Sequence, residues 1–63
     1  MHHLILSIVH AIGTASTSQI ENSIIPLGFT IYQVDGTIGY CRSQGLLKIA
    51  RQLPGARHEH LFY

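Results

Sequence analysis

The stretch Phe29 to Cys41, FTIYQVDGTIGYC, decides the fold that this sequence predicts. Two runs of β-branched and aromatic residues flank Asp35-Gly36, a dipeptide that readily adopts the two positive φ values of a type I′ turn. The stretch therefore predicts a tight β-hairpin, whose strands alternate between a core-facing side and a mixed side. The core-facing side comprises Phe29, Ile31, Ile38 and Tyr40, and the mixed side comprises Thr30, Tyr32, Val34, Thr37 and Cys41.

The chain has 63 residues, a formal net charge of +1 and a single cysteine. A chain of this length is one domain, 1–63, and buries only about 60% of its extended surface. Small domains are commonly stabilised by disulfides, metals or oligomerisation, and the lone Cys41 excludes an internal disulfide. We therefore expect a homodimer. The few charged residues exclude both a disordered chain and a strongly charged nucleic-acid binder.

The N-terminal residues His3 to His10, HLILSIVH, form an apolar run without helical periodicity, which predicts a central β-strand. The run Leu4 to Ile12 is too short to span a bilayer as a helix. It also resembles the apolar part of a signal peptide with Ala15 and Ser16 near a cleavage point, but no Lys or Arg precedes it. We expect a cytoplasmic protein without a membrane partner, which also suits a lone cysteine.

A first helix is predicted after the polar connection that follows this run. Ser18 and Glu21 have the spacing of a capping box, which satisfies two amide donors at a helix start. Pro26 bars regular continuation and Gly28 supplies the exit. The apolar side of this helix, at i, i+4 and i+7, comprises Ile20, Ile24 and Leu27.

A second helix and a closing strand complete the predicted elements. Ser43 is the expected N-cap, and Pro54-Gly55 stops the helix. Its apolar side, at i, i+3, i+4 and i+7, comprises Leu46, Ile49, Ala50 and Leu53. The last segment, Ala56 to Tyr63, is long enough for a strand and ends in Leu-Phe-Tyr.

The predicted order is therefore strand, helix, strand, strand, helix, strand. This is the ferredoxin-like βαββαβ plan, an α+β fold with a four-stranded antiparallel sheet and two helices on one face. Right-handed crossovers leave the other face of the sheet open. We expect a second copy of the chain to cover that face through Thr30, Tyr32 and Val34.

The basic residues all fall in the last third of the chain, and they are Arg42, Lys48, Arg51 and Arg57. The predicted second helix presents Lys48 and Arg51 to solvent, so each subunit would carry a modest positive patch that suits nucleic acid or an acidic protein surface. The leading hypothesis is a small, non-enzymatic binding or regulatory module that acts as a homodimer. The short length of the chain suits a phage- or plasmid-encoded protein.

The histidines suggest two alternative functions, a metal-binding module and a small nuclease. The five histidines are His2, His3, His10, His58 and His60. In the predicted fold the last strand lies beside the first, so terminal histidines would approach one another as metal ligands. His10, His58 or His60 would also suit the general acid or base of a small nuclease, because imidazole exchanges protons near neutral pH. No motif predicts a cofactor, and Cys41 is expected to be a small packed residue.

The segment PLGFTIYQVDGTIGYC resembles a region of virulence-associated protein D and the related CRISPR adaptation nucleases. In that region a helix ends in Leu-Gly-Phe, here Leu27, Gly28 and Phe29, and leads into a strand with a Gln and a later Tyr, here Gln33 and Tyr40. The resemblance implies a ferredoxin-like homodimer, and the families cleave RNA or DNA with an aspartate that ends the first strand. In this sequence His10 occupies that neighbourhood.

Overall fold

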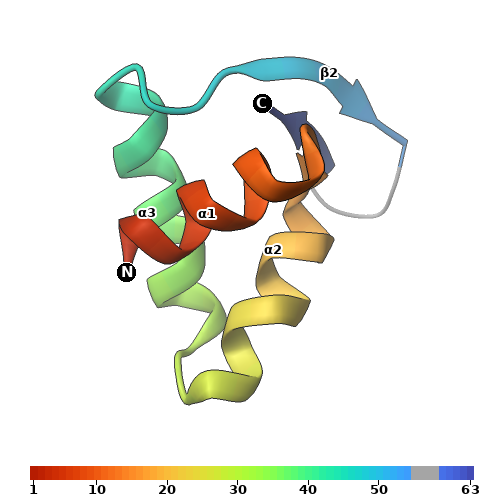
Figure 1. The fold of residues 1–63 in the computed structure, drawn as a ribbon. Helices are drawn as coiled ribbons and strands as arrows, with labels where there is room; N and C mark the ends of the chain where they lie inside the picture. Colours follow the sequence, from red (N-terminus) through yellow and green to blue (C-terminus); the bar gives the residue numbers. More distant parts are fainter. Residues whose placement is uncertain (55–58) are drawn as a thin grey trace.

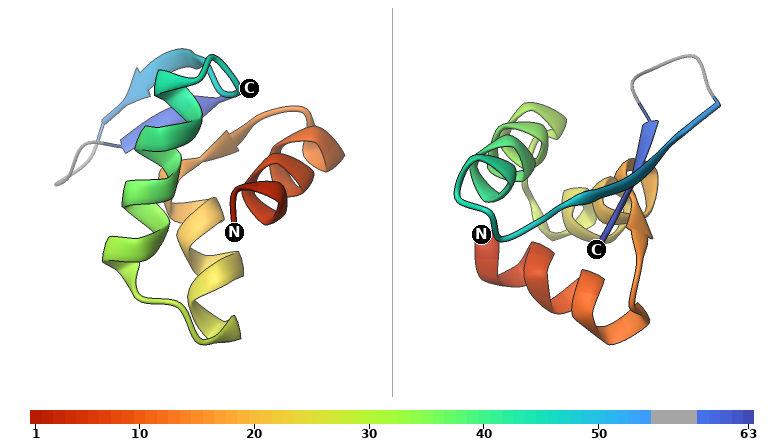
Figure 2. Two further views of the ribbon diagram at one scale, coloured as in Figure 1. Left: turned by 90° about the vertical axis from the view of Figure 1, so that its left-hand side faces the viewer. Right: turned by 90° about the horizontal axis from the view of Figure 1, so that it is seen from above.

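The computed structural model describes residues 1–54 and 59–63. The order of elements is α1 (His2–Ile12), β1 (Ala15–Ser16), α2 (Thr17–Ile24), the 3₁₀ turn η1 (Ile25–Leu27), α3 (Ile31–Ser43), β2 (Ile49–Leu53) and β3 (Glu59–Phe62). The strands form an antiparallel sheet in the order β1-β3-β2. Figures 1 and 2 show this small sheet across the end of the helices where α2 begins and α3 ends.

The ferredoxin-like prediction is wrong. The fold is α+β, but it has three helices and a three-stranded antiparallel sheet among the described residues, not two helices on a four-stranded sheet. Four of the six predicted elements have the other type of secondary structure: the first strand, both strands of the hairpin and the second helix.

The N-terminal run forms the helix α1 and not the predicted strand. Ile5 and Val9, four residues apart, are fully buried, so one side of the helix packs into the core. Leu4, which lies off this stripe, is 42% exposed, and Ile12, the last residue of the helix, is 56% exposed. Gly13, with φ of 85°, ends the helix in a conformation that favours glycine.

The predicted first helix is present as α2, but its cap lies two residues earlier than expected. Ser16 is the N-cap: its hydroxyl accepts from the Gln19 amide at 3.1 Å, and the Gln19 side chain accepts from the Ser16 amide at 2.8 Å. Ser18 instead donates its amide and its hydroxyl to the Glu59 carboxylate, both at 2.8 Å. Glu21, the expected capping partner, is buried.

The predicted hairpin is the helix α3. Thr30 caps it, because its hydroxyl accepts from the Gln33 amide at 3.2 Å and the Gln33 side chain accepts from the Thr30 amide at 2.9 Å. Val34, Ile38 and Cys41 lie at i, i+4 and i+7 and form one buried side. This helical stripe outweighs the β propensity of the individual residues.

The predicted second helix is absent, and its residues form a turn followed by β2. Gly45, with φ of 73°, ends α3 in a Schellman motif. The Gly45 amide donates to the Arg42 carbonyl at 3.1 Å, and the Leu46 amide donates to the Cys41 carbonyl at 2.8 Å. The chain then runs back along β3, the closing strand that the sequence predicts; its first predicted residues, 56–58, lie outside the described residues.

The core lies where the three helices meet the sheet. Its fully or almost fully buried members come from every helix and from β1 and β3, and they are Ile5, Val9, Ala15, Ile20, Ile24, Val34, Ile38, Cys41, Leu47 and Phe62. Phe62 is the largest of them, and it pairs with Ala15 on one side and Ile49 on the other. The sheet is therefore anchored to the helices through its central strand.

Candidate nucleic-acid interface

Two consecutive helices, α2 and α3, pack together and are joined by a short turn, as in a helix-turn-helix. The 3₁₀ turn η1 continues α2 to Leu27, and only Gly28, Phe29 and Thr30 separate it from α3. Gly28, with φ of 109°, makes the reversal possible and closes η1 by donating its amide to the Ile25 carbonyl at 3.0 Å. A short turn with a glycine between two helices is typical of this motif.

The motif leaves one side of α3 open to solvent. The buried stripe faces α1, α2 and the sheet, while the residues on the opposite side protrude from the molecule. These exposed residues are Tyr32, Gly36, Gly39, Tyr40 and Ser43. We call them the outer face of α3. Tyr32 is 85% exposed, and the two glycines leave the helix backbone uncovered.

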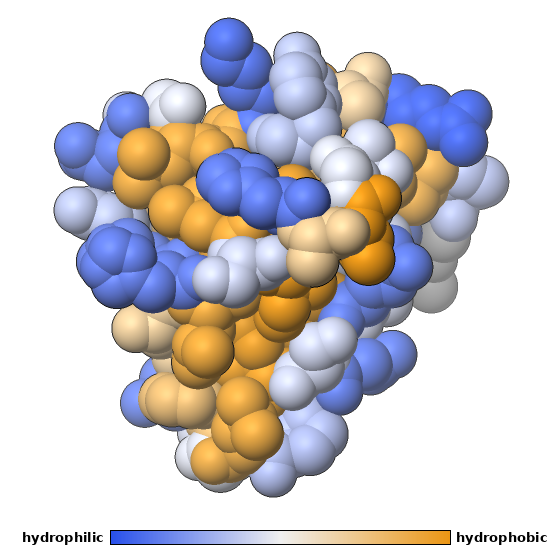
Figure 3. All heavy atoms as spheres, viewed as in Figure 1, coloured by the Kyte–Doolittle hydropathy of each residue, from blue (hydrophilic) through white to orange (hydrophobic). Residues whose placement is uncertain are grey.

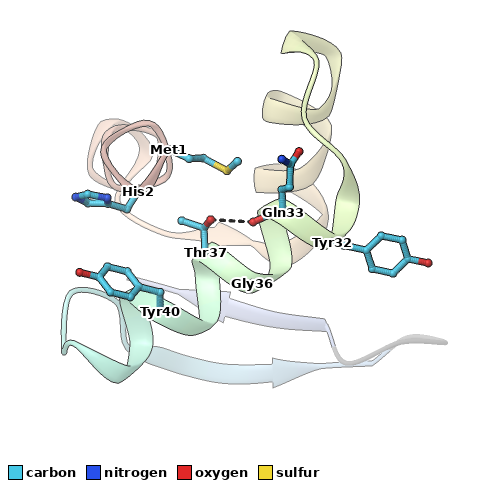
Figure 4. A pocket seen from close by; sticks show the side chains of 7 residues that line it. All are labelled: Met1, His2, Tyr32, Gln33, Gly36, Thr37 and Tyr40. Carbon is cyan, nitrogen blue, oxygen red and sulfur yellow. Dashed lines mark hydrogen bonds between the residues drawn. The ribbon is translucent and has the colours of Figure 1, made fainter.

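A first groove runs between the N-terminus of α1 and α3 (Figure 4). It has a volume of about 490 Å³ and is lined by Met1, His2, Tyr32, Gln33, Gly36, Thr37 and Tyr40. The His2 and Tyr40 rings lie 5.9 Å apart and form its far wall. Thr37 donates to the Gln33 carbonyl at 2.8 Å, which fixes the side chain at the centre of the groove.

A second groove of about 520 Å³ lies on the other flank of α3. It is lined by Gly39, Arg42, Ser43, Leu47, Lys48 and Ile49. Arg42 comes from the last turn of α3 and Lys48 from the segment before β2, and both are exposed. Two 3.0 Å hydrogen bonds with the Tyr63 backbone hold the Lys48 backbone in place, so the point from which the Lys48 side chain extends is fixed. The outer face of α3 is thus a ridge between two grooves.

The four cations predicted as a binding patch have different positions. Arg42 and Lys48 line one groove, although the second helix that was expected to present Lys48 and Arg51 is absent and Arg42 belongs to α3. Arg51 is exposed on β2, at a position paired with Leu61 of β3. Arg57 lies outside the described residues.

The residues predicted as a dimer face do not share a surface. Thr30, Tyr32 and Val34 belong to the start of α3 and not to a strand, so the open sheet face on which they were placed is absent. Val34 is fully buried within the chain, whereas Thr30 caps the helix and is exposed, as is Tyr32.

The histidines do not gather in the described part of the chain. His2 and His3 stack at 4.1 Å at the start of α1, and His10 is exposed at the other end of that helix. His60 lies on β3, where its amide donates to the Thr17 hydroxyl at 3.1 Å. Residues 1–54 and 59–63 contain no cluster of three potential metal ligands, and His58 lies outside them. The nuclease and metal-binding alternatives therefore remain hypotheses.

Cys41 packs inside the core, on the buried side of α3. Burial raises the pKa of its thiol, and the positive charge of the N-terminus opposes this effect only in part. A buried thiol with a raised pKa is a poor nucleophile. Its position agrees with a packing role.

Two signals in the sequence indicate the helix α3, and a helix over these residues places the outer face opposite its buried side. Thr30 and Gln33 have the spacing of a capping box, just before the buried residues Val34, Ile38 and Cys41 at helical spacing. Both signals favour a helix over the hairpin that Asp35-Gly36 suggests.

Comparison with protein-family models, curated proteins and solved structures finds no match to this chain. None of the helices in the described ranges combines the length and the hydropathy that crossing a bilayer requires.

Proposed function

We propose that this chain is a small DNA-binding module that places α3 in the major groove. The observation that carries the proposal is the ridge formed by the outer face of α3, which stands exposed between two grooves. In helix-turn-helix proteins the second helix enters the major groove in this way.

The dimensions of the ridge suit duplex DNA. An α-helix with its side chains is about 10–12 Å wide, and the major groove of B-DNA is about 12 Å wide. With α3 in that groove, the two DNA strands would follow the two flanking grooves of the protein. The deep, narrow major groove of double-stranded RNA does not admit a helix, which favours DNA over RNA.

Phosphate contacts in this proposal are unequal on the two flanks. Arg42 and Lys48 supply positive charge to one strand, whereas the first groove offers the uncharged donors of Gln33 and Tyr40 to the other. Each phosphate neutralised by a cation contributes a slope of about −0.9 to the logarithm of affinity against the logarithm of salt concentration. Two such contacts predict a slope of about −1.8 and modest affinity.

A homodimer that binds two half-sites would raise this affinity, and we include it in the proposal. Helix-turn-helix dimers place their recognition helices about 34–36 Å apart, one turn of DNA. Three exposed apolar side chains could be buried in such a dimer interface. They are Leu4 and Ile12 of α1 and Leu27 of η1. Figure 3 shows apolar surface extending from α1 towards the turn at η1.

The role we propose is regulatory and non-enzymatic, in the cytoplasm, where DNA is accessible and Cys41 stays reduced.

The test measures DNA binding by fluorescence anisotropy over a range of salt concentrations. We expect binding to duplex DNA in preference to duplex RNA, and a salt slope that Arg42→Gln/Lys48→Gln makes less negative by about 1.8 for each subunit bound. Arg51→Gln is the matched control, because it removes an exposed cation that lines neither groove. Arg42→Gln/Lys48→Gln removes two charges and Arg51→Gln removes one, so an effect of Arg51→Gln that is half as large would mean that net charge, and not docking of α3, drives binding. Absence of binding to any duplex would refute the proposal.

A further inference from the structure

Tyr32 is the most exposed large hydrophobic residue in the described part of the chain, at 85%. It is the second residue of α3, in the turn whose residues reach base edges when a recognition helix enters the major groove. Figure 4 shows its ring pointing away from His2 and Tyr40 and out from the molecule. None of the ring contacts among the described residues involves it. Nothing in the fold described here accounts for an aromatic ring at this position.

The neighbouring residues are poorly suited to hydrogen-bonded reading of bases. Gln33 would recognise adenine by using its carbonyl and its amide group together. Its carbonyl oxygen already accepts from the Thr30 amide at 2.9 Å, so only the amide donor remains. Gly36 and Gly39 have no side chain, and Arg42 belongs to the flank that faces the second groove. Tyr32 is therefore the chief side chain of the outer face that can reach deep into the groove near the start of α3.

We propose that Tyr32 determines sequence specificity by packing its ring against the 5-methyl group of thymine. This inference rests on the proposed docking of α3 in DNA. The methyl group is the one apolar feature that base pairs present in the major groove, and apolar side chains recognise it by contact. A tyrosine ring is rigid and large, so it buries a methyl group with little loss of conformational freedom. Removal of one buried methyl group is expected to weaken binding about fourfold.

The experiment begins with selection of duplexes from a random-sequence library by the whole chain. In the best duplex each thymine is then replaced by uracil, which removes the 5-methyl group and leaves base pairing unchanged. We expect one or two positions at which uracil weakens binding about fourfold. Tyr32→Ala is expected to abolish that discrimination, whereas Tyr32→Phe keeps the ring and is expected to retain it.

The control is Tyr63→Ala, which removes a tyrosine ring that is 52% exposed just after β3 and does not line either groove. It should leave discrimination between thymine and uracil unchanged. Circular dichroism of each variant checks that α3 stays folded.

Equal binding of thymine and uracil duplexes by the wild-type chain would overturn the inference while leaving DNA binding intact. Loss of discrimination in Tyr32→Phe would also overturn it, because the hydroxyl and not the ring would then make the contact. If no duplex is enriched, the proposed function fails and this inference fails with it.

Discussion

Replacing Gly39 by alanine should make the protein more stable and a poorer DNA binder. Gly39 lies inside α3, and positive φ among the described glycines is confined to Gly13, Gly28 and Gly45. A Cβ atom placed on Gly39 meets no heavy atom within 4 Å, so the methyl group fits without strain. Glycine inside a helix is about 1 kcal/mol less favourable than alanine.

The expected gain in unfolding free energy is therefore about 1 kcal/mol. For a domain of this size it raises the melting temperature by about 4–8 °C. Thermal and urea unfolding, followed by circular dichroism, measure this gain. DNA binding should change in the opposite direction, because the added methyl group holds the backbone of α3 away from the floor of the major groove.

Gly45→Ala is the matched control for stability. Gly45 has φ of 73° at the end of α3, where an alanine costs about 1–2 kcal/mol. The same substitution should therefore have opposite signs at two positions six residues apart in one region of the chain. A destabilising Gly39→Ala would refute the reasoning about the helix. A stabilising Gly39→Ala that binds DNA as tightly as the wild type would refute the close approach of α3 to DNA.

Two further changes test how α3 is held in place. Thr30→Ala removes the hydroxyl that caps α3 and should lower the unfolding free energy in urea by about 1 kcal/mol, whereas the exposed Thr14→Ala should have little effect. Cys41 has a raised pKa in the folded protein, so its contribution to stability is complete below the ordinary thiol pKa and is lost as pH rises through the raised value. Urea unfolding of the wild type and Cys41→Ala across this alkaline range should show the extra loss in the wild type alone; parallel curves would contradict it.

The sequence was sufficient to predict the elements whose signals are local and agree with one another. Apolar residues at helical spacing, Pro26 and Gly28 predict the helix α2 and its exit, and both are present, although the N-cap is Ser16 and not the predicted Ser18. The closing strand is also present over Glu59–Phe62. The outer face of α3 was not predicted, because Tyr32 and its neighbours were assigned to a strand.

The wrong predictions concern segments that carry two patterns at once. In 29–41 the β-branched residues and Asp35-Gly36 favour a hairpin, while Thr30, Gln33 and the spacing of Val34, Ile38 and Cys41 favour a helix. Apolar residues on both sides of His3 to His10 fit a buried strand as well as a helix. In each case periodicity alone does not choose between the two structures.

The sequence by itself determined where helices can begin and end, because capping side chains and glycines with positive φ act through hydrogen bonds between residues only a few positions apart. The tertiary structure decided which of two apolar patterns became the buried one. Ile5, Val9 and Val34 are in the core because α1, α2 and α3 pack together and Phe62 of β3 belongs to the same buried cluster. Burial is a property of the assembled chain, since the apolar area removed from water depends on what each segment packs against.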